Sequence, residues 1–211
     1  MEAAISKHSP TSVKVLPVME RFYTLQGEGN YQGHAAYFIR LGGCDVGCVW
    51  CDVKDSWEAG NHPLLSIEEL VMHVQQTPAR IVVITGGEPL LHDLTDLTSQ
   101  LKKVGVRIHI ETSGSSPLSG TLDWITLSPK KFKAPLPEVL PYANELKIIV
   151  FNKSDFVWAE EYASKVSPSC RLYLQPEWSK TEIITPLIIS YIKSHPQWQL
   201  SLQIHKYINV P

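Results

Sequence analysis

The segment RLGGCDVGCVWCDVKDSW, residues 40–57, contains three of the chain's four cysteines. Cys44, Cys48 and Cys51 follow the spacing C-x3-C-x2-C, and three glycines accompany them. Three thiolates can hold three irons of a cubane iron–sulfur cluster and leave the fourth iron open to a small molecule. Glycines let the backbone wrap closely around an inorganic core. The segment therefore predicts a 4Fe-4S cluster with one coordination position free.

A structural zinc site is the main alternative for these cysteines. Zinc would need a fourth ligand, and the sequence offers Asp45, Asp52, His34 and His62. Zinc sites usually pair two short Cys or His spacings, whereas this chain has one triplet without a second half. Cys170 stands alone in the run SCRLYLQ and is interpreted as a buried thiol without a chemical role. The spacing favours the iron–sulfur cluster.

The composition is that of a globular protein with 211 residues, 44% of them hydrophobic and 19% charged. This length predicts a single domain, residues 1–211. The formal net charge of -2 gives no broad basic surface, which argues against nucleic acid as the main ligand. No apolar run approaches the roughly 20 residues of a membrane-spanning helix, and the N-terminus lacks the apolar core of a secretory signal. We expect a cytoplasmic protein without a membrane partner.

A series of apolar runs rich in Val and Ile predicts β-strands. The runs are AAYFIRLGG, ARIVVITGG, VRIHIETSG, DWITLSP, ELKIIVFN, CRLYLQPE and QLSLQIHKY. Helical patterns alternate with them: SIEELVMHVQQT, LTDLTSQLKKVG, DFVWAEEYASKV and EIITPLIISYIK. Ser66 and Glu69 predict a capping box for the first helix, and Gly105 is expected to end the second. The alternation predicts a parallel sheet with right-handed crossovers.

The predicted barrel is incomplete. The proline-rich segment APLPEVLPYANE disfavours a crossover helix after DWITLSP. The chain is also shorter than the roughly 250 residues of a complete eight-fold barrel. The predicted fold class is therefore α/β, with an abridged, partial parallel β/α barrel. Residues 1–18 carry no motif and are expected to be an N-terminal extension that caps the barrel or is disordered.

Five unusual segments each follow the end of a predicted strand: GGC, TGGEP, ETSG, SPK and LQPE. In parallel α/β folds the carboxyl ends of the strands carry the functional site. We therefore expect these segments to meet on one rim of the sheet, although each one alone is typical of a turn or a strand-end loop.

The cysteine triplet, with the aromatic Trp50 directly before its third member, resembles the signature of radical S-adenosylmethionine (SAM) enzymes. The segment ITGGEPLL, residues 84–91, resembles the glycine-rich segment of that superfamily. In the superfamily the open iron binds SAM, and reductive cleavage of SAM yields a radical that abstracts a hydrogen atom from the substrate. The resemblance implies SAM as cofactor and a barrel of the radical SAM type.

Further matches extend over nearly the whole chain: YTLQGEGNYQG, FIRLGGC, IETSGS, LSPK, LQPE and HKYINVP. Together they resemble the 7-carboxy-7-deazaguanine synthases, which contract the ring of 6-carboxy-5,6,7,8-tetrahydropterin with loss of ammonia on the route to 7-deazapurines such as queuosine. The resemblance implies a lyase that forms a homodimer, requires magnesium and takes electrons from a donor such as a flavodoxin or a ferredoxin.

The resemblance also assigns residues to the cofactor. The glycine-rich segment is expected to meet the ammonium group of SAM through carbonyl and carboxylate oxygens, because these accept hydrogen bonds from an ammonium donor. The implied cofactor-binding residues are Trp50, Asp52, Gly86, Gly87, Glu88, Gly114, Ser128, Pro129, Lys130, Gln175 and Pro176.

A second set of residues is assigned to the substrate: Leu25, Gln26, Gly27, Glu28, Arg40, Thr112 and Pro211. Arg40 is expected to hold the substrate carboxylate by a bidentate fork, with a strand-end salt bridge as the alternative. Pro211 is expected to reach the pocket with its main-chain carboxylate, and His205 and Lys206 to lie on the preceding strand. Glu111 is expected to orient its neighbours.

One position departs from the pattern of these synthases. They commonly carry Thr or Ser two positions after the third cysteine as a magnesium ligand, whereas this chain has Val53, which offers no side-chain oxygen. Three alternatives follow. Substrate, water and backbone hold the ion, or Asp52, Asp55 or Ser56 supplies a ligand, or the dependence on magnesium is weaker.

Two other functions compete with the synthase. A radical SAM activating enzyme for a glycyl radical protein would share the cysteine loop and the small size, but YTLQGEG and the proline ending speak against it. A non-catalytic iron–sulfur or zinc module would bind metal without cleaving SAM.

Overall fold

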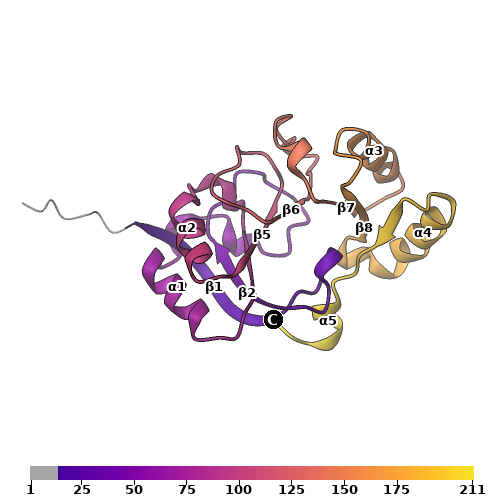
Figure 1. Ribbon diagram of the computed structural model, residues 1–211. Helices are drawn as coiled ribbons and strands as arrows, with labels where there is room; N and C mark the ends of the chain where they lie inside the picture. Colours follow the sequence, from indigo (N-terminus) through magenta and orange to yellow (C-terminus); the bar gives the residue numbers. More distant parts are fainter. Residues whose placement is uncertain (1–13) are drawn as a thin grey trace, which may run out of the picture.

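The computed structural model describes residues 14–211, and one nine-stranded sheet runs through this part of the chain in the order β3-β1-β2-β4-β5-β6-β7-β8-β9 (Figure 1). The strands are β1 (Val15–Leu25), β2 (Ala35–Leu41), β3 (Leu64–Ser66), β4 (Ile81–Gly86), β5 (Arg107–Thr112), β6 (Trp124–Leu127), β7 (Glu145–Val150), β8 (Arg171–Pro176) and β9 (Trp198–Leu200). The helices are α1 (Ile67–Gln75), α2 (Thr95–Lys103), α3 (Ser154–Ala163), α4 (Thr181–Ser194) and α5 (Ile204–Ile208).

The parallel part of the sheet confirms the predicted fold class. β2 pairs with β4 in parallel, and every following strand pairs in parallel with the next one up to β9. The order of the strands ends at β3 on one side and β9 on the other, so the barrel is partial. Only the short 3-10 turn Leu140–Tyr142 stands between β6 and β7, where the prolines disfavoured a helix.

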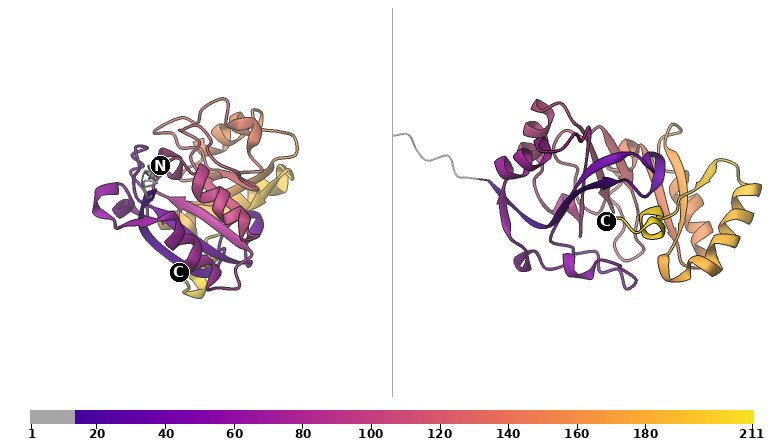
Figure 2. Two further views of the ribbon diagram at one scale, coloured as in Figure 1. Left: turned by 60° about the vertical axis from the view of Figure 1, so that its left-hand side comes forward. Right: turned by 90° about the horizontal axis from the view of Figure 1, so that it is seen from below.

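Two hydrophobic clusters support the sheet. One packs α1 and α2 against β2, β4 and β5, and the other packs α3 and α4 against β7 and β8. Figure 2 shows these helix pairs at the two ends of the molecule. The predicted capping box of α1 is confirmed, because Ser66 Oγ accepts from Glu69 N at 3.2 Å and the Glu69 carboxylate accepts from Ser66 N at 2.8 Å. Gly105 follows α2 with φ +80°, which suits glycine.

The first strand was not expected. β1 is antiparallel to both β2 and β3, and its buried and exposed residues alternate only weakly. Residues 15–18 of the expected N-terminal extension therefore belong to the sheet, while residues 1–13 lie outside the described part of the chain. Pro17 and the charged pair Glu20 and Arg21 hid this strand, because proline is usually confined to edges or bulges of sheets.

The prediction of a strand through QLSLQIHKY was wrong beyond Leu200. Ser201 Oγ accepts a hydrogen bond from Gly29 N at 3.0 Å, and Ile204 N donates to Gly27 O at 3.0 Å. Ser201 N still donates to Leu174 O of β8 at 3.0 Å, and the chain then turns toward the loop after β1. His205 and Lys206 consequently lie on the short helix α5 instead of a strand. In residues 14–211 no helix combines the length and apolar character that crossing a membrane requires.

Candidate active site

A cavity of about 410 Å³ opens at the carboxyl ends of the parallel strands. All five segments that were expected to meet at one rim contribute to its lining. Of the predicted site residues, those that line it are Leu25, Gln26, Gly27, Glu28, Arg40, Cys44, Cys48, Trp50, Cys51, Asp52, Gly86, Gly87, Thr112, Ser128, Lys130, Gln175, Pro176 and Pro211. Glu88, Gly114 and Pro129 lie outside the lining.

The cysteine loop is fixed at its base by backbone hydrogen bonds. Gly43 N donates to Ser56 O at 2.7 Å, and Cys44 N donates to Trp57 O at 3.1 Å. Gly43 and Gly47 have φ values of +105° and +74°, which side chains rarely tolerate. These contacts and glycine conformations define the shape of the loop.

The glycine-rich segment after β4 packs directly against this loop. A Cβ on Gly87 would stand 2.3 Å from Gly43 O and 2.7 Å from Cys44 Cβ, so no other residue fits without movement of the backbone. Glu88 N donates to Gly43 O at 2.8 Å. The two segments form one unit, which explains why glycine is needed at this position.

Glu88 has a different place from the one expected. Its side chain is buried, and its carboxylate accepts hydrogen bonds from Thr112 Oγ1 at 2.6 Å, Ser113 N at 2.8 Å and Leu90 N at 3.1 Å. Ser113 Oγ donates to it as well, at 2.5 Å. These donors occupy the carboxylate, so Glu88 fixes the end of β5 beside the cavity.

The cysteine side chains fit a cluster better than a single metal ion. Burial raises the pKa of the Cys48 thiol to about 11 and also raises that of Cys44, so ionising them requires a strongly cationic partner such as an iron–sulfur core. In a cubane each thiolate binds its own iron. Within residues 14–211 no His, Asp or Glu side chain joins the cysteines in a group that could hold one metal ion.

The candidate fourth zinc ligands are all engaged elsewhere. Asp45 pairs with a lysine at 2.6 Å, and Asp52 pairs with another at 2.7 Å. His62 Nε2 lies 2.9 Å from Asp55 O, and His34 Nδ1 lies 3.1 Å from the carbonyl oxygen of Tyr31. None of them reaches toward the cysteine triplet, whereas a structural zinc site needs its four ligands around one ion.

The wall beside Cys48 comes from the loop after β6. Lys130 Nζ donates to Ser128 O at 2.8 Å and lies 5.9 Å from the ring centroid of Trp50. Burial lowers the pKa of Lys130, and its positive charge faces the cysteine thiol. An anion such as a thiolate or a carboxylate is therefore favoured at this wall.

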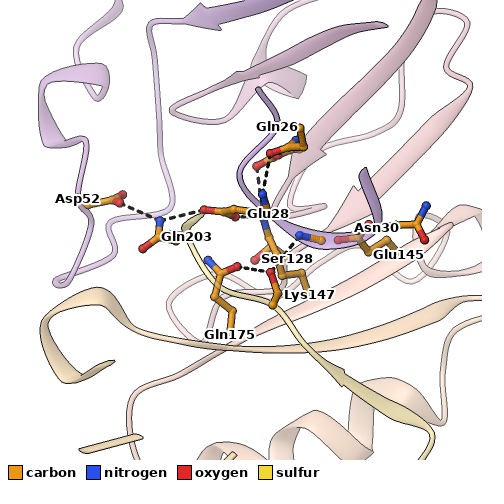
Figure 3. A network of polar contacts seen from close by, with 12 residues as sticks. Gln26, Glu28, Asn30, Asp52, Ser128, Glu145, Lys147, Gln175 and Gln203 are labelled. Atoms are coloured by element: carbon orange, nitrogen blue, oxygen red, sulfur yellow. Dashed lines mark hydrogen bonds and ion pairs between the residues drawn. The ribbon is translucent and has the colours of Figure 1, made fainter. Parts of the chain in front are cut away.

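A buried ionic network forms another part of the cavity (Figure 3). The Lys147 ammonium forms ion pairs with Glu28 and, at 3.4 Å, with Glu111. Gln203 Nε2 donates to Glu28 Oε1 at 2.9 Å, and Gln26 Nε2 donates to Glu111 Oε1 at 2.9 Å. Burial by itself would raise the pKa of Glu28, but Lys147 lowers it well below its ordinary value. Glu28 is therefore an ionised acceptor at the cavity.

Lys147 and Gln203 were not predicted as site residues. Lys147 is only 3% exposed, and although burial by itself would lower its pKa, the surrounding carboxylates raise it. A lysine between the apolar residues Leu146 and Ile148 of β7 was a usable signal, because lysine is almost never buried unless it is paired. Gln203 follows β9 without a comparable signal.

The loop LQGEGN is held against the fold, with Gln26 and Gly27 buried and Glu28, Gly29 and Asn30 half-buried, unlike the surface turn that glycine-rich polar stretches usually form. Asn30 N donates to Glu145 Oε2 at 3.1 Å, and a Cβ on Gly29 would stand 1.9 Å from Glu145 Oε1. A Cβ on Gly27 would stand 2.0 Å from His205 Nδ1. Contacts with β7 and α5 thus hold Glu28 in place.

Arg40 lies in the cavity lining and also forms the salt bridge given as its alternative. Its Nε donates to Glu20 Oε1 at 2.6 Å, and its side chain is 20% exposed. This bond uses one edge of the guanidinium, and the group has five N–H donors. The salt bridge and a carboxylate contact are therefore compatible.

The fold and the site define a radical SAM enzyme, and the family model described as the Radical SAM superfamily matches residues 38–133. The chain is 53% identical to the 7-carboxy-7-deazaguanine synthase of Flavobacterium psychrophilum over 94% of either chain. It is 53% identical to the synthase of the same name from Synechocystis sp., over 92% of this chain and 93% of that relative. The chain belongs to the 7-carboxy-7-deazaguanine synthase family.

A solved structure agrees with this assignment. The crystal structure of QueE from Escherichia coli superposes with a TM-score of 0.79 at 37% sequence identity, covering 89% of this chain and 93% of that one. These relatives do not favour the alternative of an activating enzyme for a glycyl radical protein. As a radical SAM protein the chain uses a 4Fe-4S cluster and SAM.

Proposed function

We propose that this chain catalyses the radical SAM ring contraction of 6-carboxy-5,6,7,8-tetrahydropterin to 7-carboxy-7-deazaguanine, with release of ammonia, in 7-deazapurine (queuosine-type) biosynthesis. The family membership supports this activity. The single observation that carries it at the level of residues is the cavity itself, in which the cysteine triplet and the ionic network around Glu28 share one lining.

Bound to Cys44, Cys48 and Cys51, the cluster with SAM supplies the hydrogen abstraction that starts the reaction. The chain's own residues place the substrate. The ionised carboxylate of Glu28 accepts hydrogen bonds from the N–H edge of the pterin, and Gln26 adds an amide. Lys147 keeps Glu28 ionised and fixed. The cofactor thus supplies the radical chemistry, and the protein orients the substrate.

Arg40, Thr112 and Pro211 complete the proposed substrate contacts, together with Leu25 and Gly27. A guanidinium binds a carboxylate through two parallel hydrogen bonds, so Arg40 suits the carboxylate of the pterin. The position of Pro211 in the cavity lining supports a contact with the bound substrate.

The proposed contacts with SAM come from the loops of the rim. Gly86 and Gly87 present backbone atoms at the cavity, while Trp50 and Lys130 form the wall beside Cys48. Asp52, Ser128, Gln175 and Pro176 also line the cavity and are proposed SAM contacts. The remaining cofactor residues, Glu88, Gly114 and Pro129, act by fixing these loops.

The decisive test is anaerobic reconstitution of the full chain with iron and sulfide. Reductant, SAM and 6-carboxy-5,6,7,8-tetrahydropterin are then added, and products are identified by mass. We expect 7-carboxy-7-deazaguanine together with ammonia. An activating enzyme would instead leave the pterin unchanged, and a metal-binding module would leave SAM intact, so either result would contradict the proposal.

We propose that magnesium assists this reaction without a side-chain ligand at Val53. Ser56 is buried and its Oγ donates to Val53 O at 2.6 Å, and Asp55 lies outside the cavity lining. Asp52 lines the cavity but pairs with Lys206, which lowers its pKa although burial opposes this. Substrate oxygens and water therefore supply most of the ligands. Turnover after chelation, with and without added magnesium, measures the dependence.

We further propose that the chain forms a single domain, works in the cytoplasm as a homodimer and receives its electron from a flavodoxin or a ferredoxin. The continuous sheet across both hydrophobic clusters supports the single domain. Sedimentation of the reconstituted protein determines the oligomeric state, and replacing the chemical reductant by either electron carrier tests the donor.

A further inference from the structure

A second, small cavity lies behind the ionic network. The volume open to the centres of water molecules is about 10 Å³, which is room for about one water-sized species. Glu28, Glu111 and Lys147 line both this cavity and the active site, so the two spaces share a wall. His109 and Glu145 line only the small cavity. Its location places it next to the proposed pterin site.

His109 has a buried ring nitrogen without a hydrogen-bond partner. The residue is only 3% exposed, and its Nε2 has no hydrogen-bond partner among residues 14–211. Burial and the charge of Arg107 lower its pKa to about 4, so the imidazole is neutral and one ring nitrogen carries a lone pair. A buried polar atom without a partner is costly, which indicates that a small species able to form hydrogen bonds fills the cavity.

The charges around the cavity favour a cation over water. Three carboxylates line it, from Glu28, Glu111 and Glu145, against the single ammonium of Lys147. Glu145 accepts only from neutral donors, the backbone N–H of Asn30 at 3.1 Å and an indole N–H at 3.3 Å. Burial raises the pKa of Glu145, and a cation in the cavity would stabilise its ionised form.

Two aromatic side chains, Tyr31 and Trp124, also line the cavity. The ring of Tyr31 lies 4.4 Å from that of His109 and 5.0 Å from that of Trp124, measured between centroids. Ring faces of Tyr and Trp attract cations. The Arg107 guanidinium lies 5.4 Å from the Tyr31 ring centroid, but its residue is exposed, so solvent screens its charge.

We propose that this small cavity binds ammonium. The ion is close to water in size, and its four N–H donors suit the carboxylates and the unpartnered imidazole of His109. The identity of the ion rests on the proposed function, because ammonia is the product released on the other side of the shared wall. Binding itself requires no turnover and is tested separately.

The test compares ammonium, rubidium and sodium chlorides at equal ionic strength on the reconstituted full chain. Rubidium is a probe of similar size that anomalous diffraction detects. We expect ammonium and rubidium to raise the midpoint of thermal unfolding about 2–4 °C above sodium, and rubidium to occupy the cavity.

His109→Phe, which fills the space, should abolish the difference. Glu145→Gln, which keeps the shape, should reduce it at least twofold, and His73→Phe outside the cavity should leave it unchanged.

Equal midpoints in all three salts would overturn the inference, as would water instead of rubidium in the cavity. If His109→Phe does not fold, Glu145→Gln decides the outcome alone. Loss of the pterin activity with a persisting ammonium effect would count against the proposed function only. Normal product formation without an ammonium effect would count against the ammonium site only.

Discussion

The cysteine loop and the buried ionic network face the same cavity, but they are held in different ways. The loop depends on backbone contacts with the neighbouring strand, where Gly87 leaves no space for a side chain. The network depends on charged side chains from distant segments: Glu28 and Lys147 are 119 positions apart, and Glu28 and Gln203 are 175 apart. Damage to the loop should therefore remove the chemistry, whereas damage to the network should first reduce stability and orientation.

The largest effect is expected in the loop. Cys48→Ser should eliminate the iron–sulfur cluster and all SAM cleavage, because the remaining cysteines cannot hold three irons. Cys170→Ser is the matched control, since Cys170 is buried away from the cavity and its Sγ donates to Arg171 O at 3.7 Å. Iron content and 5'-deoxyadenosine after reduction measure both variants. Full iron content in Cys48→Ser would show that the triplet is not the ligand set.

The next largest effect is expected at Gly87, whose backbone packs against the cysteine loop. Gly87→Ala should reduce turnover by about 100-fold, because the new Cβ displaces the cysteine loop and a misplacement of about 1 Å costs that much in rate. Gly60→Ala is the control, as a Cβ there has no neighbour within 4 Å. Turnover with SAM in excess compares the two. Equal rates would mean that the loop adjusts freely.

Mutations in the ionic network should mainly lower the unfolding free energy. Lys147→Met removes the cation that pairs with Glu28 and Glu111, whose side chains are 13% and 23% exposed, and the expected loss in unfolding free energy is about 3–5 kcal/mol. Lys165→Met removes an exposed pair with Glu161 and should leave the unfolding free energy nearly unchanged. Urea unfolding of both variants gives the comparison. A similar small loss in both would contradict the stabilising role of the network.

The same network predicts sensitivity to acid. Because the folded pKa of Glu28 is lowered, its stabilising contribution is complete above its ordinary pKa of about 4.3 and is lost as the pH falls through the lowered value. The raised pKa of Lys147 acts in the opposite direction, since its contribution is complete below about 10.4 and is lost only at higher pH. Glu28→Gln should show a smaller loss of unfolding free energy between pH 6 and pH 3 than the unchanged chain, a pH range set by these pKa values.

The smallest effect is expected at the start of α1, which belongs neither to the cysteine loop nor to the ionic network. Ser66→Ala removes the acceptor for Glu69 N at the start of α1 and should lower the unfolding free energy by about 1 kcal/mol. Turnover per folded molecule should stay unchanged, because α1 contributes nothing to the cavity lining. Chemical unfolding and activity on the same preparation measure this separation, and a fall in activity would mean that the two hydrophobic clusters are coupled to the site.

The two regions also differ in what the sequence predicts of them. The cysteine spacing and the glycines reflect local backbone geometry. Short sequence segments therefore suffice to predict the cysteine loop, the segment TGGEP and their location at one rim of the sheet. The ion pairs of Lys147 depend on tertiary packing of segments that are far apart in the chain. In the sequence, the only sign of these ion pairs is the lysine inside the strand β7. The sequence does not show which carboxylates pair with it.

The strand β1 and the helix α5 also could not be predicted from their own sequence patterns. The strand β1 contains a proline and many polar residues, so its antiparallel pairing with β2 follows from the sheet and not from its own pattern. The segment around His205 has the alternation of a strand, but hydrogen bonds to the loop after β1 turn it into α5. Tertiary contacts outweigh local propensity in both cases.

The most direct measurement of the central claim is the electron paramagnetic resonance spectrum of the reduced, reconstituted chain before and after SAM is added. The account predicts a 4Fe-4S signal that changes on addition of SAM, because the iron without a cysteine ligand takes up the cofactor. Cys48→Ser should lack the signal. A wild-type spectrum that SAM leaves unchanged, or protein without iron after reconstitution, would contradict the account.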